Sequence, residues 1–273
     1  MALNNPAFSR SPAFNGATTG AGGVAVAQNI SAEQLDEIYN RASAPVEGET
    51  MTIEDTIAKT AGTFALLLVG AGIGWLTHES IPFLWIGAGI VGFVLALVNI
   101  FKKEPSAPLI LAYSGAQGVF VGGISAFYEA MFPGVVVQAV IATLVVVGVT
   151  LALFASGKIR ASKRATKVFL VAMVGYLVFS LVNVGIMIFG GAGGNPWGLR
   201  GSVEIFGIPL GVILGVFVVI LAAYSLVLDF DFIQKGVNNK APRKYGWTGA
   251  FGIMVTVIWL YLELLRMFAI ARD

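Results

Sequence analysis

The sequence predicts an all-α, polytopic membrane protein, a bundle of seven transmembrane helices behind a polar N-terminal tail. Of its 273 residues, 57% are hydrophobic and only 12% are charged, and the mean hydropathy is +0.84. Soluble domains carry about 25% charged residues. The chain also has 34 glycines, a residue that lets helices approach closely in lipid. Apolar runs of about 20 residues recur along the chain without the alternation of a barrel, which favours membrane-spanning helices.

Seven such runs are separated by polar or Pro/Gly-containing breaks. We expect spans near 57–76, 82–101, 107–131, 134–154, 166–190, 206–232 and 248–269. The residues before them are polar and rich in Ala, Gly and Ser, a composition typical of disorder. The predicted organisation is therefore a disordered tail at 1–50 and a membrane domain at 51–273.

Lysine and arginine residues are concentrated in every second loop. Those loops hold Lys102, Lys103, Lys158, Arg160, Lys163, Arg164, Lys167, Lys235, Lys240, Arg243 and Lys244. The alternate loops hold only Arg200. By the positive-inside rule, this asymmetry predicts a cytoplasmic N-terminus and an extracytoplasmic C-terminus.

Two pairs of glycines predict close contacts between helices. Gly70 and Gly74 lie in the first span, and Gly118 and Gly122 lie in the third. A spacing of four residues places small residues on one helical face, where the backbones of two helices can touch.

Several functional classes are excluded by composition. The chain has no cysteine and one histidine, so thiol chemistry and most zinc sites are absent. A net charge of +2 provides no basic field for nucleic acid. No serine–histidine–aspartate set or phosphate-binding loop is recognisable. We expect neither an enzyme nor a tightly bound cofactor.

The candidate site consists of acids within or near spans, because ionisable groups are expensive in a bilayer. Asp229 is expected near the end of the sixth span, and Glu263 lies in the seventh. If they face each other, two close carboxylates cannot both ionise cheaply, so the pair would share a proton or bind a hard cation such as calcium. Arg266 lies three residues after Glu263, so a closed structural ion pair is an alternative. Asp231 could simply reach the lipid headgroups.

Short segments around these acids resemble the transmembrane Bax inhibitor motif family, in its bacterial YccA-type branch. The resemblance covers roughly residues 50–273. It lies in Tyr224-Ser-Leu-Val-Leu-Asp229-Phe-Asp-Phe-Ile233, Leu260-Tyr-Leu-Glu263, Gly122-Gly-Ile-Ser-Ala-Phe-Tyr-Glu129 and Val136-Val-Gln-Ala-Val-Ile-Ala-Thr143.

The resemblance implies a bundle with the seventh helix near the centre and a pH-sensitive calcium leak across a membrane. It also implies that Asp229 and Glu263 share hydrogen bonds and sense protons, with Lys102 in the place of a latch arginine. This sequence departs from the family in having Glu263 for the commoner aspartate, lysine for the latch arginine, and Arg266 beside the acids.

The expected function is a leak for calcium ions that is gated by protons, in a bacterial plasma membrane. Two alternatives remain. One is a non-conducting regulator that binds another membrane protein, such as a membrane-bound protease. The other is a proton-coupled cation exchanger. The sequence does not fix the oligomeric state.

Overall fold

The computed structural model describes residues 49–190 and 195–273. Apart from Glu49 and Thr50, the tail expected at residues 1–50 lies outside this part of the chain. The description below concerns the membrane domain alone.

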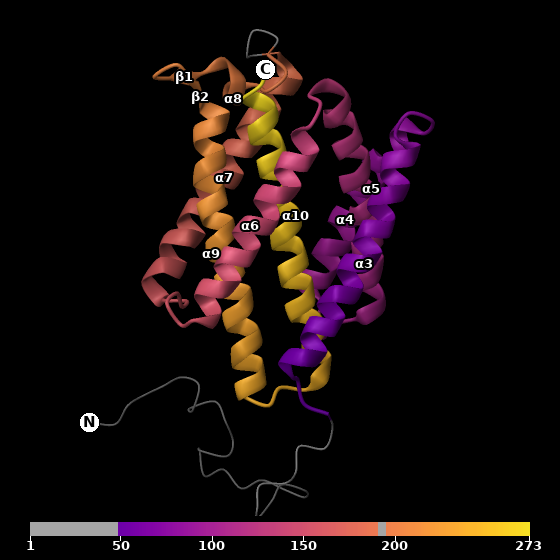
Figure 1. Ribbon diagram of the computed structural model, residues 1–273, viewed down its shortest axis with the longest axis vertical. Helices are drawn as coiled ribbons and strands as arrows, with labels where there is room; N and C mark the ends of the chain where they lie inside the picture. Colours follow the sequence, from indigo (N-terminus) through magenta and orange to yellow (C-terminus); the bar gives the residue numbers. More distant parts are fainter. Residues whose placement is uncertain (1–48, 191–194) are drawn as a thin grey trace, which may run out of the picture. The chain divides into compact units, whose positions relative to one another are not determined.

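Within the described ranges, seven helices are long and apolar enough to cross a membrane, and the predicted fold class is confirmed (Figure 1). They are α3 (Ile53–Thr77), α4 (Pro82–Phe101), α5 (Ala107–Met131), α6 (Val135–Ala155), α7 (Lys163–Phe189), α9 (Leu210–Asn238) and α10 (Gly246–Ile270). Shorter elements are α8 (Leu199–Ser202), the strands β1 (Glu204–Ile205) and β2 (Ile208–Pro209), and the 3-10 turn η1 (Arg243–Tyr245).

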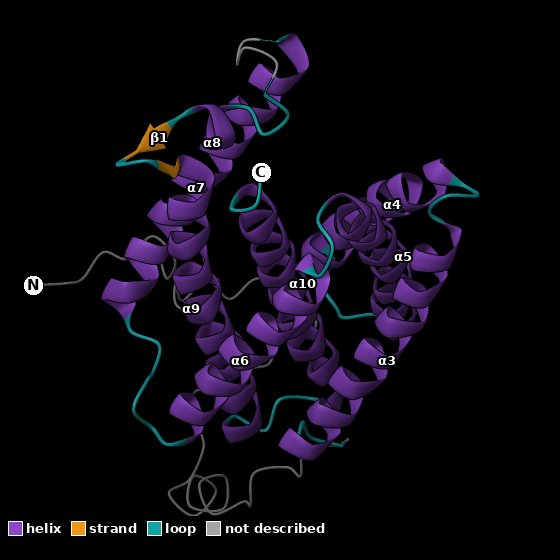
Figure 2. Cartoon of the chain, turned by 45° about the horizontal axis from the view of Figure 1, so that its top comes forward, coloured by secondary structure: helices purple, strands orange, loops and turns teal. Residues whose placement is uncertain are grey.

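The bundle has two chemically distinct ends. The loops 102–106, 156–162 and 239–242 lie at one end, which we call the basic end. The C-terminus, α8 and the β1–β2 hairpin lie together at the opposite end, here the far end (Figures 1 and 2). The loops rich in lysine and arginine therefore lie together at one end of the bundle.

The start of the sixth span was predicted incorrectly. Residues 206–209 are apolar and were expected to be helical, but they belong to the antiparallel β1–β2 hairpin. Its turn residues Phe206 and Gly207 both have positive φ, 55° and 77°. Two consecutive positive φ values are typical of the tight turn that joins two strands, and they end any helix.

The end of this span also differs from the prediction. Helix α9 continues through Asn238, six residues beyond the expected end at 232. Asp229 therefore lies about 13 Å from the end of its helix rather than near it. The chain then returns directly through residues 239–242 and η1 into α10.

Helices α3 and α5 pack backbone against backbone, as the glycine spacing predicted. A Cβ atom on Gly122 would lie 1.9 Å from the carbonyl oxygen of Ala71, and one on Gly74 would lie 2.1 Å from that of Val119. Equivalent atoms on Gly70 and Gly118 would also meet backbone oxygens, at 2.6 and 2.3 Å. Only glycine permits this separation of the two helices.

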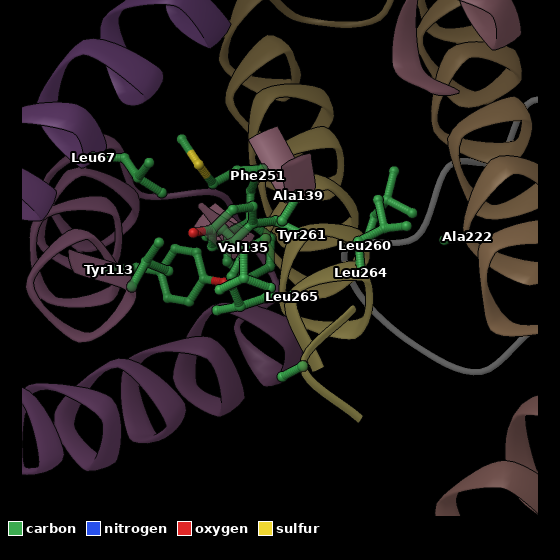
Figure 3. Packing of buried hydrophobic residues seen from close by; sticks show 14 of the residues in the cluster. Leu67, Tyr113, Val135, Ala139, Ala222, Phe251, Leu260, Tyr261, Leu264 and Leu265 are labelled. Atoms are coloured by element: carbon green, nitrogen blue, oxygen red, sulfur yellow. The ribbon is translucent and has the colours of Figure 1, made fainter. Parts of the chain in front are cut away.

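Helix α10 has more buried residues than any other described helix and packs against α9, α3, α6 and α5. Figure 3 shows Leu260, Leu264 and Leu265 of this helix among residues from its neighbours. Tyr113 of α5 meets Phe251 edge to face, with ring centroids 5.1 Å apart. The polar residues of α10 are thereby held at fixed levels between other helices.

Replacing Gly122 with alanine is expected to destabilise the protein by about 1–3 kcal/mol or more, because the new methyl group meets the Ala71 backbone. The measurement is the thermal unfolding midpoint of purified protein in detergent. Gly148→Ala in α6 is the matched control, since a Cβ there meets nothing within 4 Å. Equal midpoints for the two variants would contradict the close α3–α5 contact.

Candidate functional site

Glu263 lies in an ion network rather than beside another acid. Glu263 comes from α10 and is only 3% exposed. Arg266 Nη1 donates to Oε1 at 3.1 Å, and Arg200 Nη1 donates to Oε2 at 3.4 Å. The hydroxyl of Tyr176, from α7, also donates to Oε1. One carboxylate therefore pairs with two guanidinium groups. The ion pair between Glu263 and Arg266, which the sequence offered as an alternative, is present in the structure.

Arg200 is held against this carboxylate from the far end. Its Nη2 group donates to the Tyr176 hydroxyl at 2.8 Å and to Ser180 Oγ at 3.1 Å. Its guanidinium lies over the Tyr176 and Phe179 rings, 5.3 and 5.7 Å from their centroids. Arg200 is 3% exposed, so it lies inside the protein although it comes from a segment between spans.

The turn before α8 is positioned by Asn183 of α7. Asn183 Oδ1 accepts a hydrogen bond from the Leu199 N–H at 2.7 Å, and its Nδ2 donates to the Trp197 carbonyl at 3.2 Å. Gly198, between them, has a φ of 60°. These contacts draw the segment inward and direct Arg200 at Glu263. The sequence placed Arg200 in a loop. Its position as the single basic residue of the alternate loops was the signal that could have identified it.

Asp229 occupies a second polar position, on α9. Its Oδ2 accepts a hydrogen bond from Thr256 Oγ1 at 2.7 Å. The Thr256 hydroxyl in turn lies 3.2 Å from Ser225 Oγ. A Cβ on Gly252 would lie 2.7 Å from Asp229 Oδ1. The carboxylate therefore fits against the bare backbone at Gly252, one helical turn from Thr256.

The two acids are not directly paired. Asp229 is level with Gly252 and Thr256, whereas Glu263 lies seven residues after Thr256, about 10 Å along α10. Among the described residues, no hydrogen bond joins the two carboxylates. The expected shared bond is not formed, because Asp229 lies nine residues from the basic end of α9 whereas Glu263 lies seventeen residues from that end of α10. Joint binding of one calcium ion by both acids is not supported by this arrangement.

The other predicted residues are peripheral to both positions. Lys102 is exposed at the end of α4, and no ion pair involving it is found in the described part of the chain. Asp231 pairs with Lys235 at 2.5 Å, one turn further along α9. Neither residue contacts Asp229 through a hydrogen bond in the described ranges, so the expected Lys102 latch is not formed.

A different cluster closes the basic end. Arg243 Nη2 lies 2.8 Å from Asp55 Oδ1, and Arg243 also pairs with Glu49. Lys59 pairs with Asp55 and donates to the Arg243 carbonyl at 2.8 Å. These contacts connect the start of α3 with the α9–α10 connection.

Two further contacts extend this cluster. Lys244 Nζ lies 2.9 Å from Glu104 Oε1, which adds the α4–α5 loop. The Met51 N–H donates to the Ala241 carbonyl at 2.7 Å. We call the ion pairs of Glu49, Asp55, Lys59, Glu104, Arg243 and Lys244 the Arg243 clamp.

A cavity of about 970 Å³ lies beside α7 and extends from Glu263 to Ser225 and Thr256, while Asp229 itself is not in its lining. We call it the α7 cavity. Glu263, Arg200 and Arg266 line one part of it. Ser225 and Thr256, whose hydroxyls lead to Asp229, line another. One acid thus lies in the wall of the cavity, and the other lies behind the Thr256 hydroxyl at a different level.

The oxygen atoms near Asp229 are of the kind that hard cations prefer, but they form no complete metal cage. The described residues contain no group of three or more His, Cys, Asp or Glu side chains that could hold a metal ion. One carboxylate and two hydroxyls can contact a passing calcium ion, which requires six to eight oxygen ligands in total.

Glu263→Gln is expected to lower the unfolding midpoint strongly, because it leaves the buried Arg200 without its carboxylate. Breaking a buried pair on one side costs about 3–5 kcal/mol. The control is Asp231→Asn, which removes a partly exposed pair on α9 worth about 0–1 kcal/mol. Thermal unfolding of both variants in the same detergent tests this. Similar midpoints would show that Glu263 is not the partner that stabilises Arg200.

Comparison with known proteins supports the resemblance seen in the sequence. A family model described as Bax inhibitor 1 like matches residues 5–273, which include the whole membrane domain and most of the preceding tail. A search of curated proteins found no match. The assignment to a bacterial branch stays a prediction. From the extent of the family match, the chain belongs to the Bax inhibitor 1 like family.

Proposed function

We propose that this protein is a pH-sensitive leak for calcium and similar cations, in which Asp229 is the proton-sensing group. The membrane is a bacterial plasma membrane, with the basic end on the cytoplasmic side as the loop charges predict. The observation that carries the proposal is the polar track from the α7 cavity through Ser225 and Thr256 to Asp229.

The track supplies what a cation needs inside a bundle of apolar helices. Moving a charge into hydrocarbon is costly, so an ion path requires polar groups or water along it. The α7 cavity is large enough to hold water, and Asp229 provides a negative charge next to the Thr256 residue that lines it. No other acid lies within hydrogen-bonding distance of Asp229 in the described ranges, so its charge is free to attract a cation.

Protons and calcium compete for Asp229. An ionised carboxylate attracts the cation and accepts the Thr256 hydrogen bond. A protonated carboxyl carries no charge and binds a hard cation poorly. Acidification therefore lowers flux in this mechanism. Glu263 has a different role, since its charge is offset by Arg200 and Arg266, and it organises the wall of the cavity.

The Arg243 clamp acts as the closure at the basic end. It connects three segments of the chain close to the point where the path from Asp229 must leave the protein. Surface ion pairs are individually weak, about 0–1 kcal/mol, so a cluster of them can hold a closed state while still permitting opening.

Calcium entry into dye-loaded proteoliposomes tests the proposal. Wild-type flux is expected to fall on acidification from about pH 8 to about pH 5, because the proton neutralises Asp229. Asp229→Asn should give the low flux at both pH values. Asp231→Asn, the matched control two residues away, should behave as wild type.

Two results would contradict the leak, and a third would contradict the role of Asp229. Folded protein without flux above empty liposomes would favour the regulator of a membrane-bound partner. Calcium flux that appears only when a proton gradient is imposed would favour the exchanger. Unchanged pH dependence in Asp229→Asn would remove Asp229 as the sensor.

Arg243→Gln is expected to raise flux at every pH by a few fold, since it removes the ion pairs to Glu49 and Asp55. Lys102→Gln is the control and should leave flux unchanged, because this residue is exposed beside the clamp. The same liposome assay measures both. A larger effect of Lys102→Gln would restore the latch expected from the sequence.

A further inference from the structure

We propose that the α7 cavity binds an anionic amphiphile with one acyl chain, of the fatty-acid class, with its carboxylate at Arg266. This inference does not rest on ion conduction, because it concerns binding in the cavity and its test measures binding alone.

The charges around the cavity do not cancel in its interior. Arg200 and Arg266 share the single carboxylate of Glu263, which leaves one positive charge in an apolar setting. Asp273 also lines the cavity, but it is exposed at the far end, where solvent screens its charge. A monoanion of opposite charge would complete this arrangement.

Arg266 is placed to receive that anion. A guanidinium has five N–H donors, and the bond to Glu263 uses the Nη1 group of Arg266. Its side chain remains 33% exposed, whereas that of Arg200 is 4% exposed. Arginine matches the two oxygens of a carboxylate with paired donors, which makes it well suited to this headgroup.

The rest of the cavity is suited to an acyl chain. Its walls include Val174, Leu177, Trp197, Trp259 and Tyr128, so most of the lining is apolar. Ligand pockets usually enclose about 300–1,000 Å³, and this cavity of about 970 Å³ is at the large end of that range. A chain of this kind fills space that a small anion would leave empty.

Helix α7 leaves the cavity accessible from the lipid. Asn183 is the one buried residue in α7, all of which the structure describes. The helix is attached near the basic end, where Thr166 lies 3.0 Å from the Tyr224 hydroxyl, at its middle by Tyr176, and near the far end by Asn183. Val174 and Leu177 lie between these attachments and are 61% and 57% exposed. An amphiphile from the bilayer can enter along this wall.

Tryptophan quenching measures this binding directly, since Trp197 and Trp259 line the cavity. Full-length protein in phosphatidylcholine nanodiscs would be titrated with dibrominated stearic acid, whose bromines quench indole fluorescence on contact. The matched probe is its methyl ester, which has the same chain and no charge. We expect saturable quenching by the acid at a concentration about tenfold or more below that of the ester.

Variants separate the cavity from the lipid around the protein. Arg266→Gln should reduce the preference for the acid about tenfold, whereas Arg272→Gln, an arginine outside the cavity, should retain it. Val174→Phe adds bulk to the cavity wall without a new indole and should weaken saturable quenching. Trp259→Phe should remove a large part of the quenched signal.

Equal quenching by acid and ester would overturn the proposal, as would an Arg266→Gln variant that behaves like Arg272→Gln. Displacement of the acid by acetate alone at similar concentration would also overturn it, because the cavity would then bind free anions without a chain. A protein that binds the acid and conducts no calcium would retain this site and lose only the leak.

Discussion

The Glu263 carboxylate, shared by two guanidinium groups inside an apolar bundle, is the interaction on which the candidate site depends. It connects three parts of the chain: α10 through Glu263 and Arg266, α7 through Tyr176, and the α8 segment through Arg200. A charge in this position is costly without partners, and its partners would be equally costly without it. The network therefore specifies how the far end closes over the α7 cavity.

The bundle combines one tightly packed part with one loosely packed part. Helices α3 and α5 are joined through glycine backbones, and α10 is covered by α9, α3, α6 and α5. Helix α7 is different, because most of its residues remain exposed and polar contacts at its middle and near its two ends hold it. The wall of the cavity with the fewest packing constraints is thus also the wall that faces lipid.

The sequence was sufficient for the class of fold because hydrophobic length and loop charge are properties of short segments. It also located the glycine contacts of α3 and α5, since their spacing is itself the packing motif. It failed at the sixth span, where the apolar Phe206-Gly207 turn resembles helix in hydropathy and only its φ values distinguish it. It also failed for Arg200, because a loop position says nothing about whether the loop folds inward.

The pairing of acids illustrates a second limit. Asp229 and Glu263 were both recognised as unusual, and each does occupy a polar position in the bundle. Their relative level depends on how far α9 continues past Asp229, and the six additional residues include Gln234, Lys235 and Asn238, which hydropathy assigns to a loop. Register between two helices is a tertiary property, and local composition does not determine it.

The strand-like contact at the basic end has a mechanical consequence. Thr50 pairs with Pro242, and the backbone of Glu49 and Met51 is bonded to Arg243 and Ala241. Displacing the chain just before α3 must therefore displace the connection between the last two helices as well. A displacement of the segment before α3 is therefore transmitted to α9 and α10. This short pairing couples the residues before the bundle to the position of Asp229.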